Sequence, residues 1–198
     1  IQEGQSTRGE FGLNLGICVY GVKLKFGGSA LLPLNAALCA WRENVDKIVI
    51  SQLVDSDRSA VFDLLQNEQT MRFLGPRRPL TDAEAEVWFA NEQQAETRFA
   101  FRSVETNEIV GFCGITLLDA ELDFGYFIRQ KFWGQGLASL MCKSAILKLA
   151  QSIDLTQVKV FIASDNVSSQ KVAHKLGWQI KCVAENEFES GHLYQIRT

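Results

Sequence analysis

Residues 131 to 138, KFWGQGLA, combine two glycines with the start of a predicted helix. Gly134 and Gly136 are separated by one residue, and the spacing of the apolar residues that follow predicts a helix directly after them. The first amides of a helix have no internal acceptors, and the helix dipole favours an anion there. Since glycine has no side chain, a phosphate group approaches such a backbone closely. The stretch therefore predicts either a phosphate-binding loop or a strand-to-helix turn without a ligand.

Two common nucleotide-binding motifs do not fit this loop. A Walker A loop requires G-x-x-x-x-G-K-[ST], which is absent from the sequence. A dinucleotide fingerprint requires a third glycine three residues after Gly136, where Ser139 stands. A dinucleotide-binding oxidoreductase is therefore an alternative that rests on the glycine turn alone.

The segments around the loop predict an α/β fold with one mixed, mostly antiparallel sheet flanked by helices. Alternating apolar residues predict strands at residues 47–54, a hairpin over 98–118, and strands at 121–128, 159–164, 178–188 and 192–198. Helical spacing and capping residues predict helices from Asp55 to Asn67 (capped by Asp55 or Asp57), from Thr81 to Glu92, from Leu137 to about Ala150, and from Asn166 to Gly177.

Composition excludes several classes of partner. The net charge of −3 does not favour binding to nucleic acid or to an anionic membrane, and no run of about 18 apolar residues indicates a membrane span. The five cysteines are odd in number and lack a C-x-x-C pair, which is typical of reduced thiols in a cytoplasmic protein. Two histidines without ligand-like spacing do not predict a metal site.

The composition and the periodicity of the sequence change near Asp46. Residues 1–46 are glycine-rich without a sustained period, and we expect a poorly specified extension or a strand or two on the edge of the domain. Residues 47–198 are locally consistent and are predicted to form one domain. Within the extension, residues 23–41 have features of a signal peptide, but Pro33 and Asn35 interrupt the apolar run.

Two motifs together carry a family resemblance. LDFGYFIRQKFWGQGLA and, about 25 residues later, ASDNVSSQKVAHKLGW resemble the GNAT superfamily of acetyl-CoA-dependent N-acetyltransferases, in particular the RimJ/RimL-type branch of ribosomal-protein N-terminal acetyltransferases. The similarity covers about residues 47 to 198 and implies a GNAT-like fold. The family's loop has the form [QR]-x-x-G-x-[GA]; Lys131 departs from it at the first position but keeps hydrogen-bond donors.

The resemblance implies which residues bind acetyl-CoA. Backbone groups of Phe127, Ile128 and Arg129 would pair with the pantetheine arm, as would the side chain of Asn166. The side chains of Arg129 and Lys131 would either add charge near the phosphates or be solvated. The pyrophosphate would be held by the amides of Trp133, Gly134, Gln135, Gly136, Leu137 and Ala138.

Catalytic roles are predicted less sharply. By resemblance, Ser169 would protonate the departing thiolate; otherwise it is a helix residue that bonds Asn166. An amine with a pKa near 10 needs a base, and the carboxylates of Asp123, Glu187 and Glu189 and the imidazole of His192 are all candidates. Because no cysteine has a nucleophile-like setting, we expect direct transfer in a ternary complex.

The sequence thus predicts transfer of an acetyl group from acetyl-CoA to a primary amine, on a protein N-terminus or a small molecule, by a monomer or homodimer. Arg72, Arg77 and Arg78, in or beside a segment that lines the acceptor side in the family, favour an acceptor with negative charge or only solvate the loop. The alternative is a binding module that keeps the acyl-CoA site without turnover.

Overall fold

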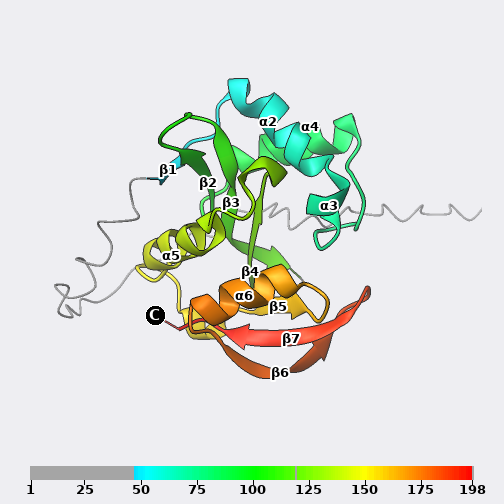
Figure 1. Cartoon of the computed structure of the whole chain (residues 1–198), viewed down its shortest axis with the longest axis vertical. Helices are drawn as coiled ribbons and strands as arrows, with labels where there is room; N and C mark the ends of the chain where they lie inside the picture. The colour runs from blue at the N-terminus through cyan, green and yellow to red at the C-terminus, as the bar shows by residue number, and fades with distance from the viewer. Residues whose placement is uncertain (1–46, 119, 198) are drawn as a thin grey trace, which may run out of the picture.

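The computed structural model describes residues 47–118 and 120–197 (Figure 1). The predictions for residues 1–46 lie outside this part of the chain. Within it, the strands form two sheets. The first has the antiparallel order β1 (Ile48–Ser51), β2 (Arg98–Ser103), β3 (Ile109–Leu118), β4 (Glu121–Ile128). The second has the order β5 (Val160–Ala163), β7 (Ser190–Gln195), β6 (Gln179–Glu185).

The helices are arranged around these sheets. They are α2 (Arg58–Leu65), α3 (Glu68–Met71), α4 (Asp82–Glu92), α5 (Leu137–Leu149) and α6 (Val167–Lys175), with short 3-10 turns η1 (Asp55–Asp57), η2 (Gln130–Phe132) and η3 (Leu155–Gln157). None of the helices in the described residues is long and apolar enough to cross a membrane. The predicted α/β fold of mostly antiparallel strands flanked by helices is confirmed, and the predicted order of the longer elements is observed. The one sheet that was expected is observed as two.

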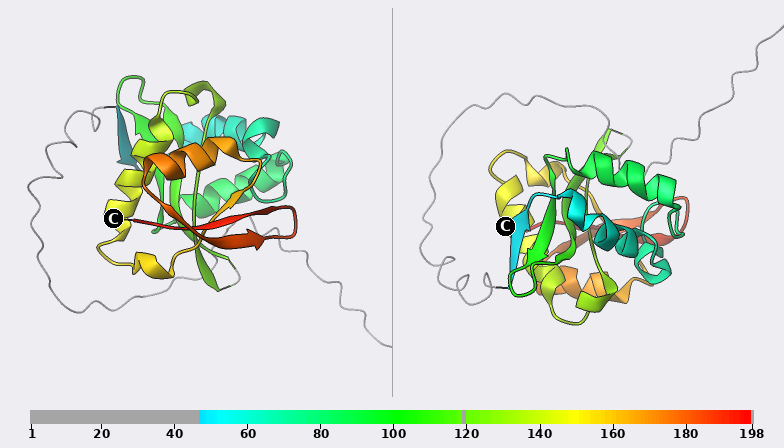
Figure 2. Two further views of the ribbon diagram at one scale, coloured as in Figure 1. Left: turned by 60° about the horizontal axis from the view of Figure 1, so that its bottom comes forward. Right: turned by 90° about the horizontal axis from the view of Figure 1, so that it is seen from above.

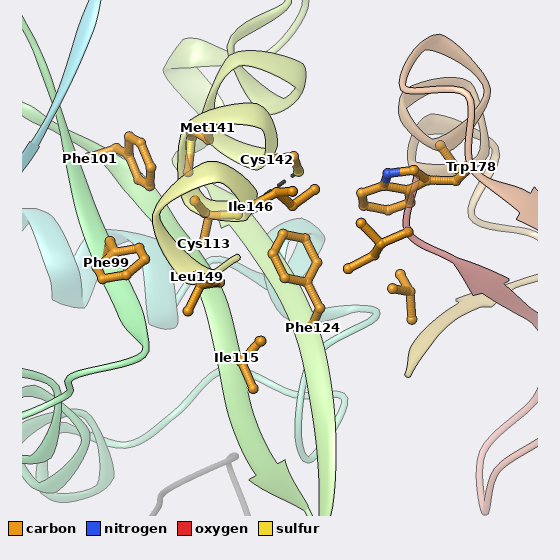
Figure 3. Packing of buried hydrophobic residues seen from close by; sticks show 14 of the residues in the cluster. Phe99, Phe101, Cys113, Ile115, Phe124, Met141, Cys142, Ile146, Leu149 and Trp178 are labelled. Atoms are coloured by element: carbon orange, nitrogen blue, oxygen red, sulfur yellow. Dashed lines mark hydrogen bonds between the residues drawn. The ribbon is translucent and has the colours of Figure 1, made fainter. Parts of the chain in front are cut away.

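Two apolar cores pack on opposite faces of the first sheet. Seen from above, α2 and α4 lie on one side of it and α5 and α6 on the other (Figure 2). The core on the α5 side joins the two sheets, since the ring of Phe124 on β4 meets Trp178 edge-on at 5.7 Å between centroids (Figure 3). The second core contains Phe112 and Trp88 of α4, and the partly buried Phe127 packs against both rings.

Local hydrogen bonds explain where the helices begin and end. In the predicted capping box, the Glu84 amide donates to Thr81 Oγ1 (3.3 Å) and the Thr81 amide to Glu84 Oε2 (2.8 Å). Gly177 follows α6 with a φ of +71°, as expected for the residue after a helix. The predicted cap of α2 is wrong. This segment begins as the 3-10 turn η1, and the Asp57 carboxylate does not cap the helix but accepts from the Val54 amide and from Arg102.

The two sheets meet at an isolated parallel bridge between Asp123 and Lys159. The Phe124 amide donates to the Lys159 carbonyl (2.8 Å), and the Lys159 amide donates to the Leu122 carbonyl (2.7 Å). Beyond this point β4 and β5 belong to different sheets. We call the diverging segments, residues 125–128 and 160–163, the β4–β5 fork.

Candidate active site

The two glycines of the loop both have left-handed backbone conformations. Gly134 and Gly136 each have a φ of +75°, and Gly136 is the N-cap of α5. No side chain caps this helix, so its first-turn amides are free for a ligand. A Cβ built on Gly134 has no heavy atom within 4 Å, which places the loop against open space. This geometry fits an anion at the start of α5.

The loop before the glycines is held by its own hydrogen bonds. The Trp133 amide donates to the Gln130 carbonyl (3.0 Å), and Trp133 Nε1 donates to the Ile128 carbonyl (2.7 Å). Gln135 Nε2 donates to the Lys131 carbonyl (3.2 Å). The Trp133 amide is therefore engaged within the loop, and its predicted role toward a phosphate is contradicted.

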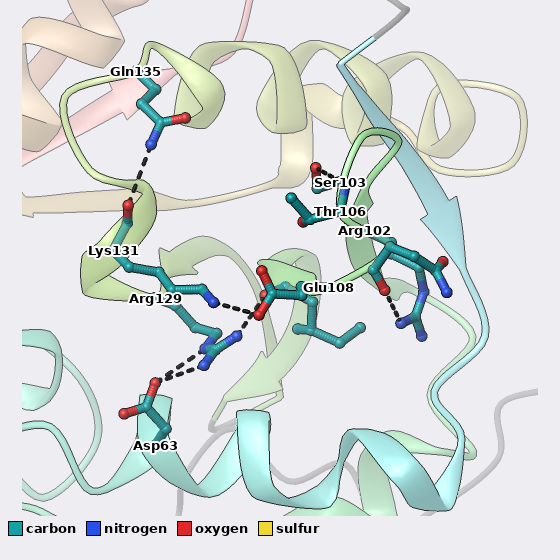
Figure 4. Close-up of polar contacts among 10 residues, drawn as sticks. Asp63, Arg102, Ser103, Thr106, Glu108, Arg129, Lys131 and Gln135 are labelled. Atoms are coloured by element: carbon teal, nitrogen blue, oxygen red, sulfur yellow. Dashed lines mark hydrogen bonds and ion pairs between the residues drawn. The ribbon is translucent and has the colours of Figure 1, made fainter.

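Arg129 and Lys131 have carboxylate partners away from the glycines (Figure 4). The buried Arg129 guanidinium donates to Asp63 Oδ2 (2.9 Å) and to the Ile109 carbonyl (3.3 Å). Lys131 forms an ion pair with Glu108, and this hydrogen bond lowers the pKa of the Glu108 carboxyl. Neither side chain is directed at the glycine turn, so the predicted alternative in which they add charge near the phosphates is not observed. Lys131 is exposed, as the other alternative expects, whereas Arg129 is buried in its ion pair.

A different cation lies beside the turn. Lys175, in the last turn of α6, places its Nζ 3.8 Å from the Cβ position of Gly136. A positive side chain and the positive end of α5 thus converge on one point, an arrangement that favours a phosphate between them. Nothing in the sequence around Lys175 indicated this, because the contact joins residues 39 positions apart (175 − 136).

The backbone of β4 offers hydrogen-bonding groups to the fork. The Arg129 amide donates to the Val110 carbonyl (2.9 Å), and alternation in the antiparallel ladder directs the backbone groups of Phe127 toward Phe112. The expectation for Phe127 and Arg129 is therefore wrong. Alternation turns the groups of Tyr126 and Ile128 away from β3, and the Ile128 carbonyl is already bonded to Trp133. The groups that face the fork are the Ile128 amide and both groups of Tyr126, a residue that sequence reasoning missed.

Asn166 and Ser169 stand at the start of α6, on the far side of the fork. Asn166 Oδ1 accepts from the Ser169 amide (3.1 Å), so Asn166 caps the helix with its oxygen while its Nδ2 is not needed for the cap. This contact uses the backbone of Ser169 and leaves its hydroxyl for other partners. The helix-capping role expected for this pair is thus observed, and it is compatible with the predicted binding and acid roles.

Asp123 is the candidate base nearest to the fork. Burial raises the pKa of its carboxyl to about 6, against a smaller lowering by Lys159. Its side chain lies on the face of β4 that also carries Gly125 and Phe127, because strand residues alternate between faces. A Cβ built on Gly125 meets no atom within 4 Å, so this face is open next to Asp123. The arrangement fits a base beside a space for a small acceptor group.

The other candidate bases are less suited to the task. Glu189 forms an ion pair with Arg77, whose guanidinium also lies 4.9 Å from the centre of the Phe188 ring. Glu187 is exposed in the turn between β6 and β7, and His192 lies on β7 opposite Ile162. Asp123 is therefore the best candidate for the base among the four, because it combines burial, a raised pKa and a neighbouring open space.

The three arginines of the segment before α4 are all paired. Arg72 bonds Asp165 (2.7 Å), Arg77 pairs with Glu189, and Arg78 forms a two-pronged bond with Glu84 (2.7 and 2.8 Å). Since carboxylates already compensate these charges, they give no reason to prefer an anionic acceptor.

Comparison with known proteins identifies the family of this chain. Residues 47–179 match the family model described as an acetyltransferase (GNAT) domain. The uncharacterized N-acetyltransferase YoaA of Bacillus subtilis (strain 168) is 22% identical over 142 residues, which span 68% of this chain and 80% of YoaA.

Solved structures share the fold. A RimL ribosomal L7/L12 alpha-N-protein acetyltransferase in complex with coenzyme A superposes with a TM-score of 0.59 at 17% identity, over 75% of this chain and 92% of that one. A chimera of the spermidine N-acetyltransferase SpeG from Vibrio cholerae with hSSAT gives 0.61 at 13% identity, over 76% and 95%. Because the family model matches more than half of the chain, the protein belongs to the GNAT family of acetyltransferases.

Proposed function

We propose that the chain transfers an acetyl group from acetyl-CoA to a primary amine at the β4–β5 fork. One observation carries this proposal: the uncapped start of α5 at the glycine turn lies just after a strand whose Ile128 amide and Tyr126 backbone groups face the fork. An arm that ends in a phosphate and contains amides fits both features, whereas a turn without a ligand accounts for neither.

The residues present fit acetyl-CoA. The amides of residues 134–138 and Lys175 would hold the pyrophosphate. The Tyr126 carbonyl, the Ile128 amide and Asn166 Nδ2 would pair with the pantetheine arm. This assignment differs from the expectation from sequence at Phe127, Arg129, Lys131 and Trp133, whose groups have other partners.

Acetyl-CoA supplies a thioester whose carbonyl carbon is open to attack by an amine. The Tyr126 amide lies where it can donate to the thioester oxygen as negative charge grows there. Asp123 takes the proton that the amine must lose, and Ser169 gives a proton to the departing sulfur. The amine nitrogen gains the acyl carbon as the carbon–sulfur bond breaks, in a single ternary complex without an acyl-enzyme.

The acceptor binds on the face of β4 at Gly125, next to Asp123. The space there suits the amine end of a chain, and both acceptor types, a protein N-terminus and a small amine, present such an end. A cytoplasmic location and a monomer or homodimer remain predictions from sequence; the free thiols of Cys113, Cys142 and Cys182 support the former.

The test uses the full chain. Acetyl-CoA and NADH are titrated separately in a calorimeter, and thiol release is then followed with a panel of N-terminal peptides, polyamines and aminoglycosides. The expected result is micromolar binding of acetyl-CoA alone and thiol release with at least one amine. Binding of acetyl-CoA without turnover of any amine would replace the proposal with a binding module, and binding of NADH would indicate an oxidoreductase.

A further inference from the structure

The hydroxyl of Tyr126 is a buried polar group without a partner. Within the described residues, its Oη has almost no exposed surface and makes no hydrogen bond. A buried hydroxyl without a partner destabilises a fold, and phenylalanine would fill the same space without that cost. We therefore expect the Tyr126 hydroxyl to form a hydrogen bond with a neighbouring polar group.

The surroundings of this ring are apolar on the β3 and α5 sides. Tyr126 lies directly across from Cys113 in the ladder between β3 and β4, and it packs against the core that contains Cys142 of α5 and Phe124. Figure 3 shows Cys113, Cys142 and Phe124 in that core. Thiols are weak hydrogen-bond partners, so neither cysteine satisfies a phenol well.

On the α6 side, Ser169 is a polar residue that faces the same core as the ring. Ala173 is fully buried in the core against which Tyr126 packs. Ser169 lies four residues before Ala173, hence on the same face of α6, and so is directed toward β4. Burial raises the pKa of the Tyr126 phenol well above its usual value, and the neighbouring Ser169 hydroxyl partly opposes this shift. Tyr126 is therefore a permanent hydrogen-bond donor next to Ser169.

We propose that the Tyr126 hydroxyl donates a hydrogen bond to Ser169 Oγ and thereby turns the serine O–H toward the sulfur that leaves at the β4–β5 fork. Tyr126 is a positioning residue and keeps its own proton. Ser169 gives its proton to the thiolate and the Tyr126 bond stabilises the charge left on Oγ. Solvent then returns one proton to Oγ, and Asp123 releases to solvent the proton that it took from the amine, so that no net charge remains. This inference rests on the proposed acetyl transfer and adds to it a residue that aligns the acid.

The test compares four full-length proteins: wild type, Tyr126→Phe, Ser169→Ala and the double variant. With acetyl-CoA and an acceptor amine, we expect Tyr126→Phe to lower kcat about tenfold while the KM for acetyl-CoA changes less than about twofold. In the Ser169→Ala background, the same change should have no further effect on kcat. Tyr194→Phe, which removes a hydroxyl from the same core, is the control and should keep wild-type kcat.

A stability measurement separates a positioning role of Tyr126 in catalysis from a purely structural role in the core. Tyr126→Phe keeps the ring and its packing and removes one hydrogen bond, worth about 1 kcal/mol, so the variant should stay folded at the assay temperature even as kcat falls. An unchanged kcat, or equal effects of Tyr126→Phe with and without Ser169, would overturn the proposal while leaving acetyl transfer intact. If the wild type transfers acetyl to no amine, the proposed function fails. The hydrogen bond between Tyr126 and Ser169 is then tested by urea unfolding of the same four proteins. Additive changes in the free energy of unfolding would overturn this hydrogen bond.

Discussion

Asp123 and Lys159 form the parallel bridge at which β4 and β5 begin to diverge. The backbone on both sides of the bridge is paired, since the Phe124 amide bonds the Lys159 carbonyl and the Lys159 amide bonds the Leu122 carbonyl. Two residues after Phe124 along β4, at Tyr126, the outward backbone groups face the fork instead of a strand. The bridge therefore sets where the acyl-CoA arm can pair with β4 and places the Asp123 carboxylate beside the closed end of the fork.

Gly136→Ala tests the phosphate-binding turn. A Cβ at a φ of +75° costs about 1–2 kcal/mol of stability, and it would stand between the first amides of α5 and Lys175. We expect acetyl-CoA to bind at least about tenfold more weakly in calorimetry. Gly177→Ala is the matched control, because Gly177 has a φ of +71° with open space around it. It should lose similar stability but keep the affinity; an equal loss of affinity in both variants would refute a local role for Gly136.

Lys175→Ala tests the cation beside the turn. Removal of one partly screened charge near a phosphate should weaken acetyl-CoA binding by about three- to tenfold, and the difference should shrink as salt is raised from low to high concentration. Lys171→Ala, on the same helix and also exposed, is the control and should bind as the wild type does. An affinity for acetyl-CoA that is equal in the two variants at low salt would contradict the assignment.

Asp123→Asn tests the base and has opposite effects on activity and stability. Activity of the wild type should rise with pH through about 6, the pKa of Asp123, because only the carboxylate accepts a proton. The raised pKa means that the folded state binds this proton more tightly than the unfolded state, so the associated stability is present below about pH 4 and is lost as pH rises through about 6.

The asparagine variant removes this penalty of the ionised form. At pH 7.5 it should unfold at a higher temperature than the wild type, by an amount equivalent to at most about 3 kcal/mol, and at pH 4 the advantage should vanish. Its kcat should fall about a hundredfold or more and lose the rise near pH 6. Retention of that rise in the variant would assign the base to another residue, with Glu187 the next to test.

Gly125→Ala tests the acceptor space. Gly125 has an ordinary backbone conformation and open space at its Cβ position, so the variant should fold with an unchanged Tm and bind acetyl-CoA normally. The KM for the acceptor amine should rise severalfold, and more in Gly125→Val. Gly114→Ala serves as the contrast: its Cβ would lie 2.2 Å from the Thr97 carbonyl oxygen, so we expect a loss of about 1–3 kcal/mol of stability. An unchanged acceptor KM in Gly125→Val would place the acceptor elsewhere.

The sequence by itself determined the features that depend on neighbours within one turn of the chain. The capping box at Thr81 and Glu84, the Asn166 cap and the glycine turn all arise from contacts between residues at most a few positions apart, and each is observed as predicted. Two such motifs at a set distance were also enough to predict the GNAT family, which the match over residues 47–179 confirms.

Tertiary structure decided which groups of the site are free. Three consecutive residues at the end of β4 cannot all turn their backbone groups to the same side. Only the register with β3 shows that Tyr126 and Ile128, rather than Phe127 and Arg129, face the fork. The partners of charged side chains are likewise distant in sequence: Arg129 finds Asp63, and Lys175 reaches Gly136. Local sequence sets turns and caps because their hydrogen bonds close over a few residues, whereas strand register and ion pairs depend on which distant segments the folded core brings together.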